Sequence, residues 1–171
     1  AGINLATLES AIGPQVAVIR AMPNTPALVG EGAAAMSGGS AATESDMAWA
    51  EQILDAVGTV VRVPESQLDA VTAVSGSGPA YVFLIAEAMI QAGVLQGLDP
   101  ATADALVRQT LLGSARLLIE QDWDPAELRA RVASPGGTTE AALRVLQTGK
   151  LQETLIDAIA AATERSRELA V

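Results

Sequence analysis

The stretch AYVFLIAEAMIQAGVL, residues Ala80–Leu95, contains a single charged residue, Glu87. Its pattern is typical of an α-helix, but apolar side chains occupy nearly every face of that helix, which predicts burial on all sides. The helical part of the chain around it has roughly 105 residues, which is below the size at which one core becomes ample. We therefore expect a second copy of the chain to cover this helix, in a dimer with interlocked helices.

The sequence on both sides of this stretch predicts helices from residue 66 to residue 171. SGSGPAY, which leads into the stretch, favours a turn. Further along, two Asp-Pro pairs, at 99–100 and 124–125, each supply an N-cap followed by proline at the first helical position. The predicted helices cover QLDAVTAV (67–74) and approximately residues 80–95, 100–121, 125–131, 136–147 and 151–168.

Residues 1–65 show a different pattern. A short amphipathic helix opens the chain, and the segments QVAVIRAM (Gln15–Met22), GAAAMSG (32–38) and TVVRV (Thr59–Val63) favour strands. Between the last two segments, Thr43 and Asp46 resemble a capping box at the start of a helix over about 44–57. Strand, helix, strand indicates a βαβ unit. We interpret residues 1–65 as the end of an α/β domain whose earlier strands are absent, and the fold class as mostly α.

The composition excludes several classes of function. The formal net charge is −10, which argues against nucleic-acid and anionic-membrane partners because no basic patch exists to bind phosphates. The chain has no cysteine and no histidine, which removes disulfides, thiolate nucleophiles, Ser-His triads and ordinary zinc sites, so no metal is expected. The apolar run Val71–Ala86 is shorter than the ~20 residues of a spanning helix. With no signal-peptide pattern at its start, the chain is expected to be cytoplasmic.

The segment SPGGTTEAAL, residues Ser134–Leu143, combines helix-start signals with two glycines. Ser134 is a suitable N-cap, and Pro135 suits the first helical position. The glycine pair leaves the first-turn N–H groups open to close approach, and Thr138 and Thr139 add hydroxyl donors. One interpretation is an anion site, such as a carboxylate pocket. The other is a tight loop that enters a helix.

Three stretches together resemble the pyrroline-5-carboxylate reductases, which are NAD(P)H-dependent enzymes that reduce a cyclic imine to proline. They are MPNTPALVGEG (Met22–Gly32), DAVTAVSGSGPAYVF (Asp69–Phe83) and SPGGTTEAAL. The resemblance covers the whole chain in order. It implies a Rossmann-like dinucleotide-binding domain, of which residues 1–65 are the C-terminal remnant, and a helical substrate-binding and dimerisation domain over residues 66–171. It also implies a homodimer, which in this family often assembles further into decamers.

One motif of the resembled family is missing from the sequence. No G-x-G-x-x-G phosphate-binding turn follows a strand. We therefore expect the cofactor, NADPH or NADH, to be bound mainly by an N-terminal portion outside these residues. This chain alone is expected to bind a dinucleotide poorly and to be inactive.

The resemblance also assigns substrate contacts. In the family, the loop that matches Ser134, Gly137, Thr138 and Thr139 holds the substrate carboxylate at a helix N-terminus. Asp122 matches an acidic position that, in some relatives, reaches the substrate nitrogen from the neighbouring subunit. Its alternative interpretation is a member of a solvated acidic cluster at a helix end.

Two further pairs of residues are assigned in the same way. Thr72 and Ser77 match hydroxyl residues beside the imine, where a donor protonates or orients the ring nitrogen. Met22 and Asn24 match the segment that borders the nicotinamide. The alternatives are a helix-facing threonine, a turn serine and Asn-Thr-Pro turn chemistry.

Two other functions stay open at this point. The chain fits an all-α dimerisation module without chemistry of its own. It also fits the helical domain of a β-hydroxyacid dehydrogenase, which would contribute a catalytic lysine. Lys150 is the only lysine, and it follows Gly149 in an expected turn between helices, which argues against the dehydrogenase.

Overall fold

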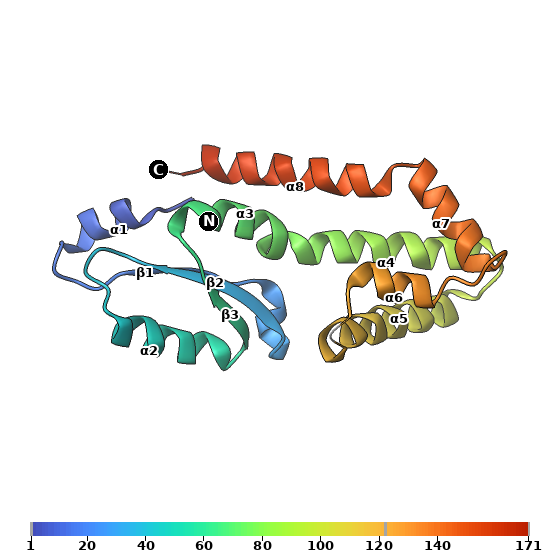
Figure 1. The fold of residues 1–171 in the computed structure, drawn as a ribbon, viewed down its shortest axis with the longest axis horizontal. Helices are drawn as coiled ribbons and strands as arrows, with labels where there is room; N and C mark the ends of the chain where they lie inside the picture. Colours follow the sequence, from blue (N-terminus) through green and yellow to red (C-terminus); the bar gives the residue numbers. More distant parts are fainter. Residues whose placement is uncertain (1, 122, 171) are drawn as a thin grey trace. The chain divides into compact units, whose positions relative to one another are not determined.

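The structure is a computed structural model that describes residues 2–121 and 123–170, and its contacts divide the chain into two units. The first unit comprises Ala1–Tyr81 and Leu155–Val171, and the second comprises Val82–Thr154. The described residues are mostly helical, with one small sheet, as the sequence predicts (Figure 1). The predicted domain boundary after residue 65 stays a prediction.

The sheet of the first unit has three strands in the order β1 (Ile19–Met22), β2 (Gly32–Gly38) and β3 (Gly58–Arg62). β1 pairs with β2 antiparallel, and β2 pairs with β3 parallel through the crossover helix α2 (Glu44–Asp55), so the predicted βαβ unit is confirmed. β1 begins four residues later than predicted, because a turn closed by Val16 N–H and Gly13 O occupies the preceding residues. The middle strand is buried at Ala35 and Met36.

Local capping chemistry sets where several helices begin. The capping box at α2 is confirmed, since Thr43 accepts from the Asp46 N–H and the Asp46 carboxylate accepts from the Thr43 N–H. Asp99 caps α5 (Pro100–Glu120), and Asp124 caps α6 (Pro125–Arg131), also as predicted. Helix α1 (Leu5–Ile12) is capped by Asn4.

The predicted turn at SGSGPAY is wrong, because the chain stays helical there. A short 3-10 helix η2 (Glu65–Gln67) leads into α3 (Leu68–Val71), then into the π-helix η3 (Thr72–Gly76), and α4 (Gly78–Leu95) follows. The Ser77 N–H donates to the Thr72 carbonyl oxygen at 2.8 Å, five residues back. The wider π turn accommodates the glycines and Pro79 without ending the helix.

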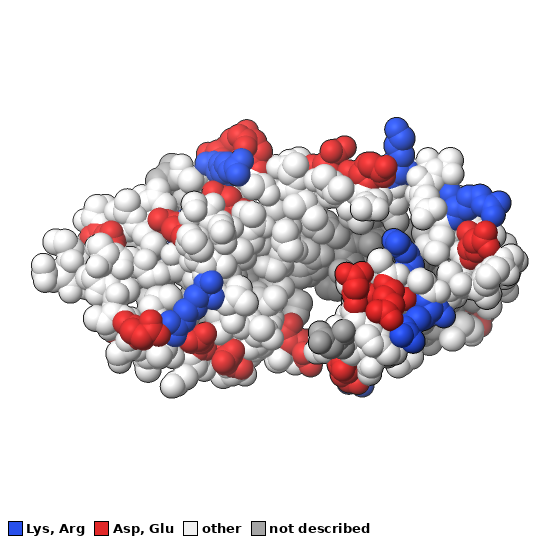
Figure 2. Space-filling view, in the orientation of Figure 1, with Lys and Arg blue, Asp and Glu red and all other residues white. Residues whose placement is uncertain are grey.

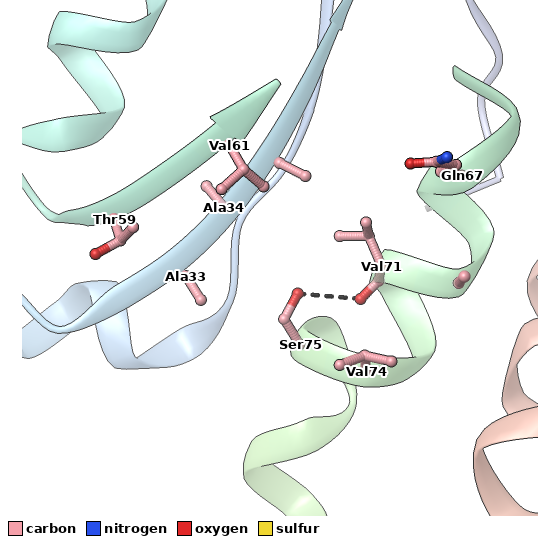
Figure 3. Close-up of a pocket in the computed structure, with 10 residues that line it drawn as sticks. Ala33, Ala34, Thr59, Val61, Gln67, Val71, Val74 and Ser75 are labelled. Carbon is pink, nitrogen blue, oxygen red and sulfur yellow. Dashed lines mark hydrogen bonds between the residues drawn. The ribbon is translucent and has the colours of Figure 1, made fainter. Parts of the chain in front are cut away.

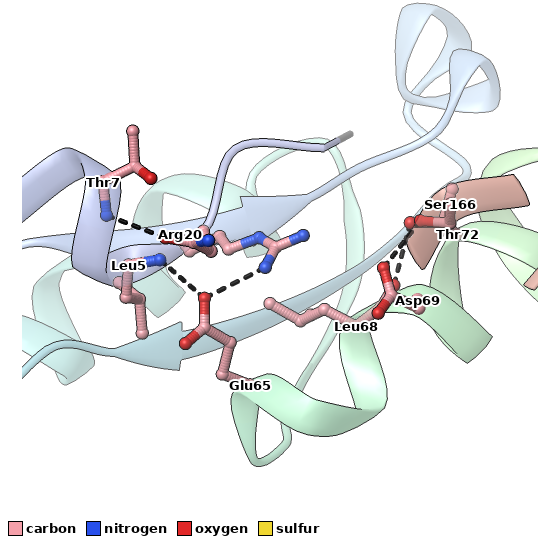
Figure 4. A network of polar contacts seen from close by, with 9 residues as sticks. Leu5, Thr7, Arg20, Glu65, Leu68, Asp69, Thr72 and Ser166 are labelled. Carbon is pink, nitrogen blue, oxygen red and sulfur yellow. Dashed lines mark hydrogen bonds and ion pairs between the residues drawn. The ribbon is translucent and has the colours of Figure 1, made fainter. Parts of the chain in front are cut away.

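A polar network joins the helices of the first unit to its sheet (Figure 4). One Glu65 carboxylate oxygen accepts from the Leu5 N–H at 2.6 Å and pairs with the Arg20 guanidinium at 3.0 Å. The Ser166 hydroxyl, near the end of α8 (Leu151–Glu168), donates to Asp69 at 2.7 Å, and Ser166 is only 3% exposed. These contacts fix the start of the helical segment 65–76 against the sheet.

The second unit holds the rest of α4, α5, α6, α7 (Thr138–Thr148) and the start of α8. Its buried apolar residues, among those described, are Ala103 and Val107. A Cβ at Gly93 would lie 3.3 Å from the Ala103 Cβ, which marks a close approach of α4 and α5.

The expected burial of α4 on all sides is not met within the single chain, and its covering by a second copy stays a prediction. No described residue of α4 is buried, and Phe83 and Leu84 are each 65% exposed. The helical stretch 65–95 is also long and apolar enough to cross a membrane by length and composition alone. On the face shown in Figure 2, uncharged atoms dominate between small clusters of acidic and basic side chains. The exposed apolar side chains of α4 form the kind of surface that marks an interaction site.

Candidate functional site

The segment that ends β1 and the π-helix meet in the first unit. The Asn24 side chain donates from Nδ2 to the Ser75 carbonyl oxygen at 3.0 Å, and its Oδ1 accepts from the Ala33 N–H at 2.9 Å. A Cβ at Gly76 would lie 2.6 Å from the Met22 Cε, so the end of the methionine side chain lies close against the π-helix at this glycine. The predicted cofactor residues Met22 and Asn24 therefore lie beside the predicted catalytic segment.

The two predicted catalytic hydroxyls differ in their surroundings. Thr72 Oγ1 donates to the Leu68 carbonyl oxygen at 2.8 Å within its own helix, so its proton is already engaged. The Ser77 hydroxyl, at the end of the π-helix, has no hydrogen-bond partner among residues 2–121 and 123–170. Of the two, Ser77 is the hydroxyl whose proton is not engaged by another described residue.

A pocket of about 400 Å³ separates the sheet from the helical segment (Figure 3). Alanine and valine side chains from β2, β3 and the helix form most of its wall. The polar side chains that line it are Thr59, Gln67 and Ser75, and the Ser75 hydroxyl donates to the Val71 carbonyl oxygen at 3.0 Å. The pocket is thus predominantly apolar and borders the same π-helix.

The loop before α7 lies in the second unit. The N-cap of α7 is Gly137 and not Ser134, so the predicted cap is wrong. The reason is a turn over residues 134–137, in which the Gly137 N–H donates to the Ser134 carbonyl oxygen at 3.0 Å and Gly136 has a φ of 71°. The left-handed backbone of Gly136 delays the helix by three residues.

The first turn of α7 keeps N–H groups available. The Gly136 N–H donates to Glu140 Oε2 at 2.6 Å, and the other Glu140 oxygen lies 3.3 Å from Arg144. Within the described ranges, the N–H groups of Thr138 and Thr139 have no protein acceptor, as expected for the start of a helix. Such groups form a ready site for a carboxylate.

The structure thus brings four of the predicted site residues together, namely Met22, Asn24, Thr72 and Ser77, and holds Ser134, Gly137, Thr138 and Thr139 on one loop of the other unit. Asp122 lies outside the described residues. Sequence reasoning missed Ser75 and Glu140. Ser75 could have been found from Pro79, four residues later. Proline has no N–H, so it cannot donate the helical hydrogen bond to the Ser75 carbonyl group.

Among the described residues, the resolved pKa shifts lie at helix caps and surface ion pairs. Hydrogen bonds from Thr43 lower the pKa of the Asp46 carboxyl, and hydrogen bonds from Thr102 lower that of Asp99. Hydrogen bonds to Glu44 and Glu51 raise the pKa of Arg62. These groups support helix ends and the surface.

Comparisons with known proteins agree with this arrangement. Residues 65–169 match the family described as pyrroline-5-carboxylate reductase dimerisation. A pyrroline-5-carboxylate reductase from Synechocystis is 47% identical over 169 residues, covering 99% of this chain and 63% of the relative. The solved structure of a pyrroline-5-carboxylate reductase from Coxiella burnetii has a TM-score of 0.96 at 42% identity and covers 100% of this chain and 64% of that one.

A third comparison carries a ligand. The crystal structure of a pyrroline carboxylate reductase from Plasmodium falciparum with NADP bound has a TM-score of 0.92 at 34% identity, covering 99% of this chain and 68% of that chain. The present chain spans about 63% of the length of the curated relative from Synechocystis.

The small sheet followed by apolar helices defines a class of proteins in which an α/β part is joined to a helical region of the dimerisation type. Within this class, the match over residues 65–169 and the likeness along the whole chain decide the family. The chain belongs to the pyrroline-5-carboxylate reductase family.

Proposed function

We propose that this chain forms the substrate-binding and dimerising part of a pyrroline-5-carboxylate reductase in proline biosynthesis. The reaction transfers a hydride from NADPH or NADH to the imine carbon of 1-pyrroline-5-carboxylate, and a proton goes to the ring nitrogen, giving L-proline and the oxidised dinucleotide. The observation that carries this proposal is the junction of the 22–24 segment with the π-helix, in a chain 47% identical to a curated reductase.

In this proposal the residues of the first unit act on the imine. Met22 borders the nicotinamide, and the Ser77 hydroxyl donates toward the ring nitrogen as the hydride arrives at the adjacent carbon. Thr72 keeps its donor within the helix, and its oxygen can still accept a hydrogen bond from the substrate. The dinucleotide phosphates are held by an N-terminal part of the subunit, because the chain has no glycine-rich phosphate turn.

The loop before α7 is proposed to hold the substrate carboxylate. The free N–H groups of Thr138 and Thr139 point out of the first turn of α7, and a carboxylate there also benefits from the helix dipole. The Thr139 hydroxyl adds a further donor. Asp122 is proposed to approach the substrate nitrogen from a neighbouring subunit.

The proposed assembly is a homodimer formed through the helical region, with a decamer as the higher assembly. The apolar surface of α4 supports it, since no described residue of that helix is buried in the single chain. Burial in a dimer also accounts for the membrane-like composition of stretch 65–95, and we propose a cytoplasmic protein without a membrane partner.

The test is an assay of NADPH oxidation with 1-pyrroline-5-carboxylate. The 171-residue chain is compared with a fusion that adds the N-terminal dinucleotide-binding part of the Synechocystis reductase. We expect turnover by the fusion and none by the chain alone. Turnover by the chain alone would contradict the proposal that an N-terminal part of the subunit is needed to bind the cofactor. A folded, dimeric fusion without turnover would favour a dimerisation module without catalysis.

A further inference from the structure

The carbonyl group of Ser75 has no donor within its own helix. In an α-helix the carbonyl of residue 75 pairs with the N–H of residue 79, and residue 79 is proline, which has no N–H. The next amide, that of Ala80, donates to the Ser77 carbonyl oxygen at 3.0 Å. The acceptor on Ser75 therefore depends on a donor from elsewhere in the chain.

The π-helix also leaves the carbonyl group of Ala73 without the backbone donor that an α-helix would give it. The Ser77 N–H would pair with Ala73 in an α-helix, but it donates to Thr72. The Tyr81 hydroxyl donates to the Ala73 carbonyl oxygen at 3.2 Å, and Ala73 is fully buried. This donor is local, because Tyr81 is only eight residues away.

Asn24 supplies the donor to Ser75 from 51 residues earlier in the chain. Its Nδ2 faces the Ser75 carbonyl oxygen, and its Oδ1 faces the Ala33 N–H. Because one partner only accepts and the other only donates, the orientation of the amide is determined. Asn24 thus ties the end of β1, the start of β2 and the π-helix to one another.

We propose that Asn24 is a positioning residue, which holds the π-helix and its Ser77 hydroxyl in register with the Met22 end of β1. This inference rests on the proposed function, in which the nicotinamide lies at Met22 and the imine at Ser77. Hydride transfer needs the reacting atoms about 3–3.5 Å apart, and a displacement of about 1 Å can cost on the order of 100-fold in rate. Loss of the amide should therefore lower kcat more than substrate or cofactor affinity.

The first experiment is independent of catalysis and uses the 171-residue chain. Amide hydrogen exchange across residues 72–77 is compared between wild type, Asn24→Ala and Asn4→Ala. Asn4 is the matched control, because its side chain also accepts a backbone N–H, from Thr7 at 2.7 Å, in the same unit. We expect exchange to rise at least tenfold in Asn24→Ala only. Equal exchange in all three proteins would overturn the proposal.

The second experiment uses the catalytic fusion. Asn24→Ala should lower kcat roughly tenfold or more and leave the KM for the imine and the Kd of NADPH within about twofold. Asn24→Asp keeps the acceptor for Ala33 but places a carboxylate oxygen against the Ser75 carbonyl. Its kcat should fall as far at neutral pH and recover, relative to wild type, as pH drops toward the aspartate range and the carboxyl gains a proton to donate.

The two experiments distinguish a failure of the proposed function from a failure of the proposed role of Asn24. A wild-type fusion without turnover contradicts the proposed function, while the exchange experiment still decides the role of Asn24. Parallel losses of kcat and NADPH affinity in Asn24→Ala would show that the side chain contacts the cofactor directly, and the positioning role would fall. An Asn24→Asp variant with a wild-type pH profile would overturn it as well.

Discussion

At the scale of single residues, Thr139 tests the carboxylate loop. A hydrogen bond to a charged group contributes about 1.5–3 kcal/mol, so Thr139→Val in the catalytic fusion should raise the KM for the imine roughly tenfold or more. The Kd of NADPH should stay within about twofold, because the loop is assigned to the substrate. Thr148→Val, at the other end of α7, is the matched control and should behave as wild type. Equal losses of substrate and cofactor affinity in Thr139→Val would assign the loop a general structural role.

Gly136 tests the shape of the same loop. Its φ of 71° lies in the left-handed region, where a residue with a Cβ pays about 1–2 kcal/mol, and where asparagine is better tolerated than alanine. Gly136→Ala should therefore raise the KM for the imine several-fold, and Gly136→Asn should raise it less. Steady-state kinetics of both variants in the fusion measure this order. A higher KM for Gly136→Asn than for Gly136→Ala would show that the φ angle of Gly136 does not determine the conformation of the loop.

At the scale of helices, the cap of α5 gives a pH-dependent stability. Hydrogen bonds from Thr102 lower the pKa of Asp99 below the usual value of about 3.9. Because the folded pKa is the lower one, this contribution is present above about pH 4 and is lost as the pH falls through the folded pKa. Asparagine caps a helix without titrating.

The measurement is thermal unfolding of wild type and Asp99→Asn from pH 7 to pH 2. Wild type should lose Tm faster than the variant below about pH 4, and the two curves should run in parallel above it. A difference in Tm that stays constant down to pH 2 would contradict this role of the carboxylate.

The elements that could be predicted from sequence are those with local signals. The capping box at Thr43 and the Asp-Pro starts of α5 and α6 involve residues a few positions apart, and the structure confirms them. The π-helix could not be predicted in this way. Its glycines and Pro79 are ordinary turn signals, and the donor that completes its hydrogen bonds, Asn24, lies 51 residues away from Ser75.

The candidate site, like the helices and strands, could be predicted only in part from the sequence. Met22, Asn24, Thr72 and Ser77 were assigned from the resemblance, and their proximity required the fold. The start of α7 was predicted at the wrong residue, because Ser134 and Pro135 carry the ordinary signals while the left-handed backbone of Gly136 decides the geometry.

At the scale of the whole molecule, the proposed dimer would be formed through the exposed apolar side chains of α4. Phe83 is 65% exposed and lines a cavity of about 790 Å³ with Ile90 and Leu111. Phe83→Glu would place a charge in the buried interface of the dimer, which is strongly unfavourable. The Kd of the dimer, measured by sedimentation equilibrium, should therefore rise at least 100-fold.

The matched control is Trp49→Glu. Trp49 is 68% exposed on α2, outside the matched dimerisation region, so this variant adds the same charge without affecting the dimer. A wild-type chain that stays monomeric at all concentrations, with a cooperative melt, would refute the assembly. Dissociation caused equally by both variants would point to net charge rather than to this surface.

The sparse core of the second unit has a consequence for how the protein reaches its native state. Among the described residues of that unit, only Ala103 and Val107 are buried apolar side chains, so in the proposed dimer its helices would gain most of their packing when two chains meet. Folding would then end in a bimolecular step, and the rate of regaining native structure from denaturant should increase with protein concentration. Until the two chains associate, each newly made chain would expose an apolar helical surface. Chains with such surfaces aggregate or bind chaperones. Supply of newly made chains would thus set how fast mature protein accumulates.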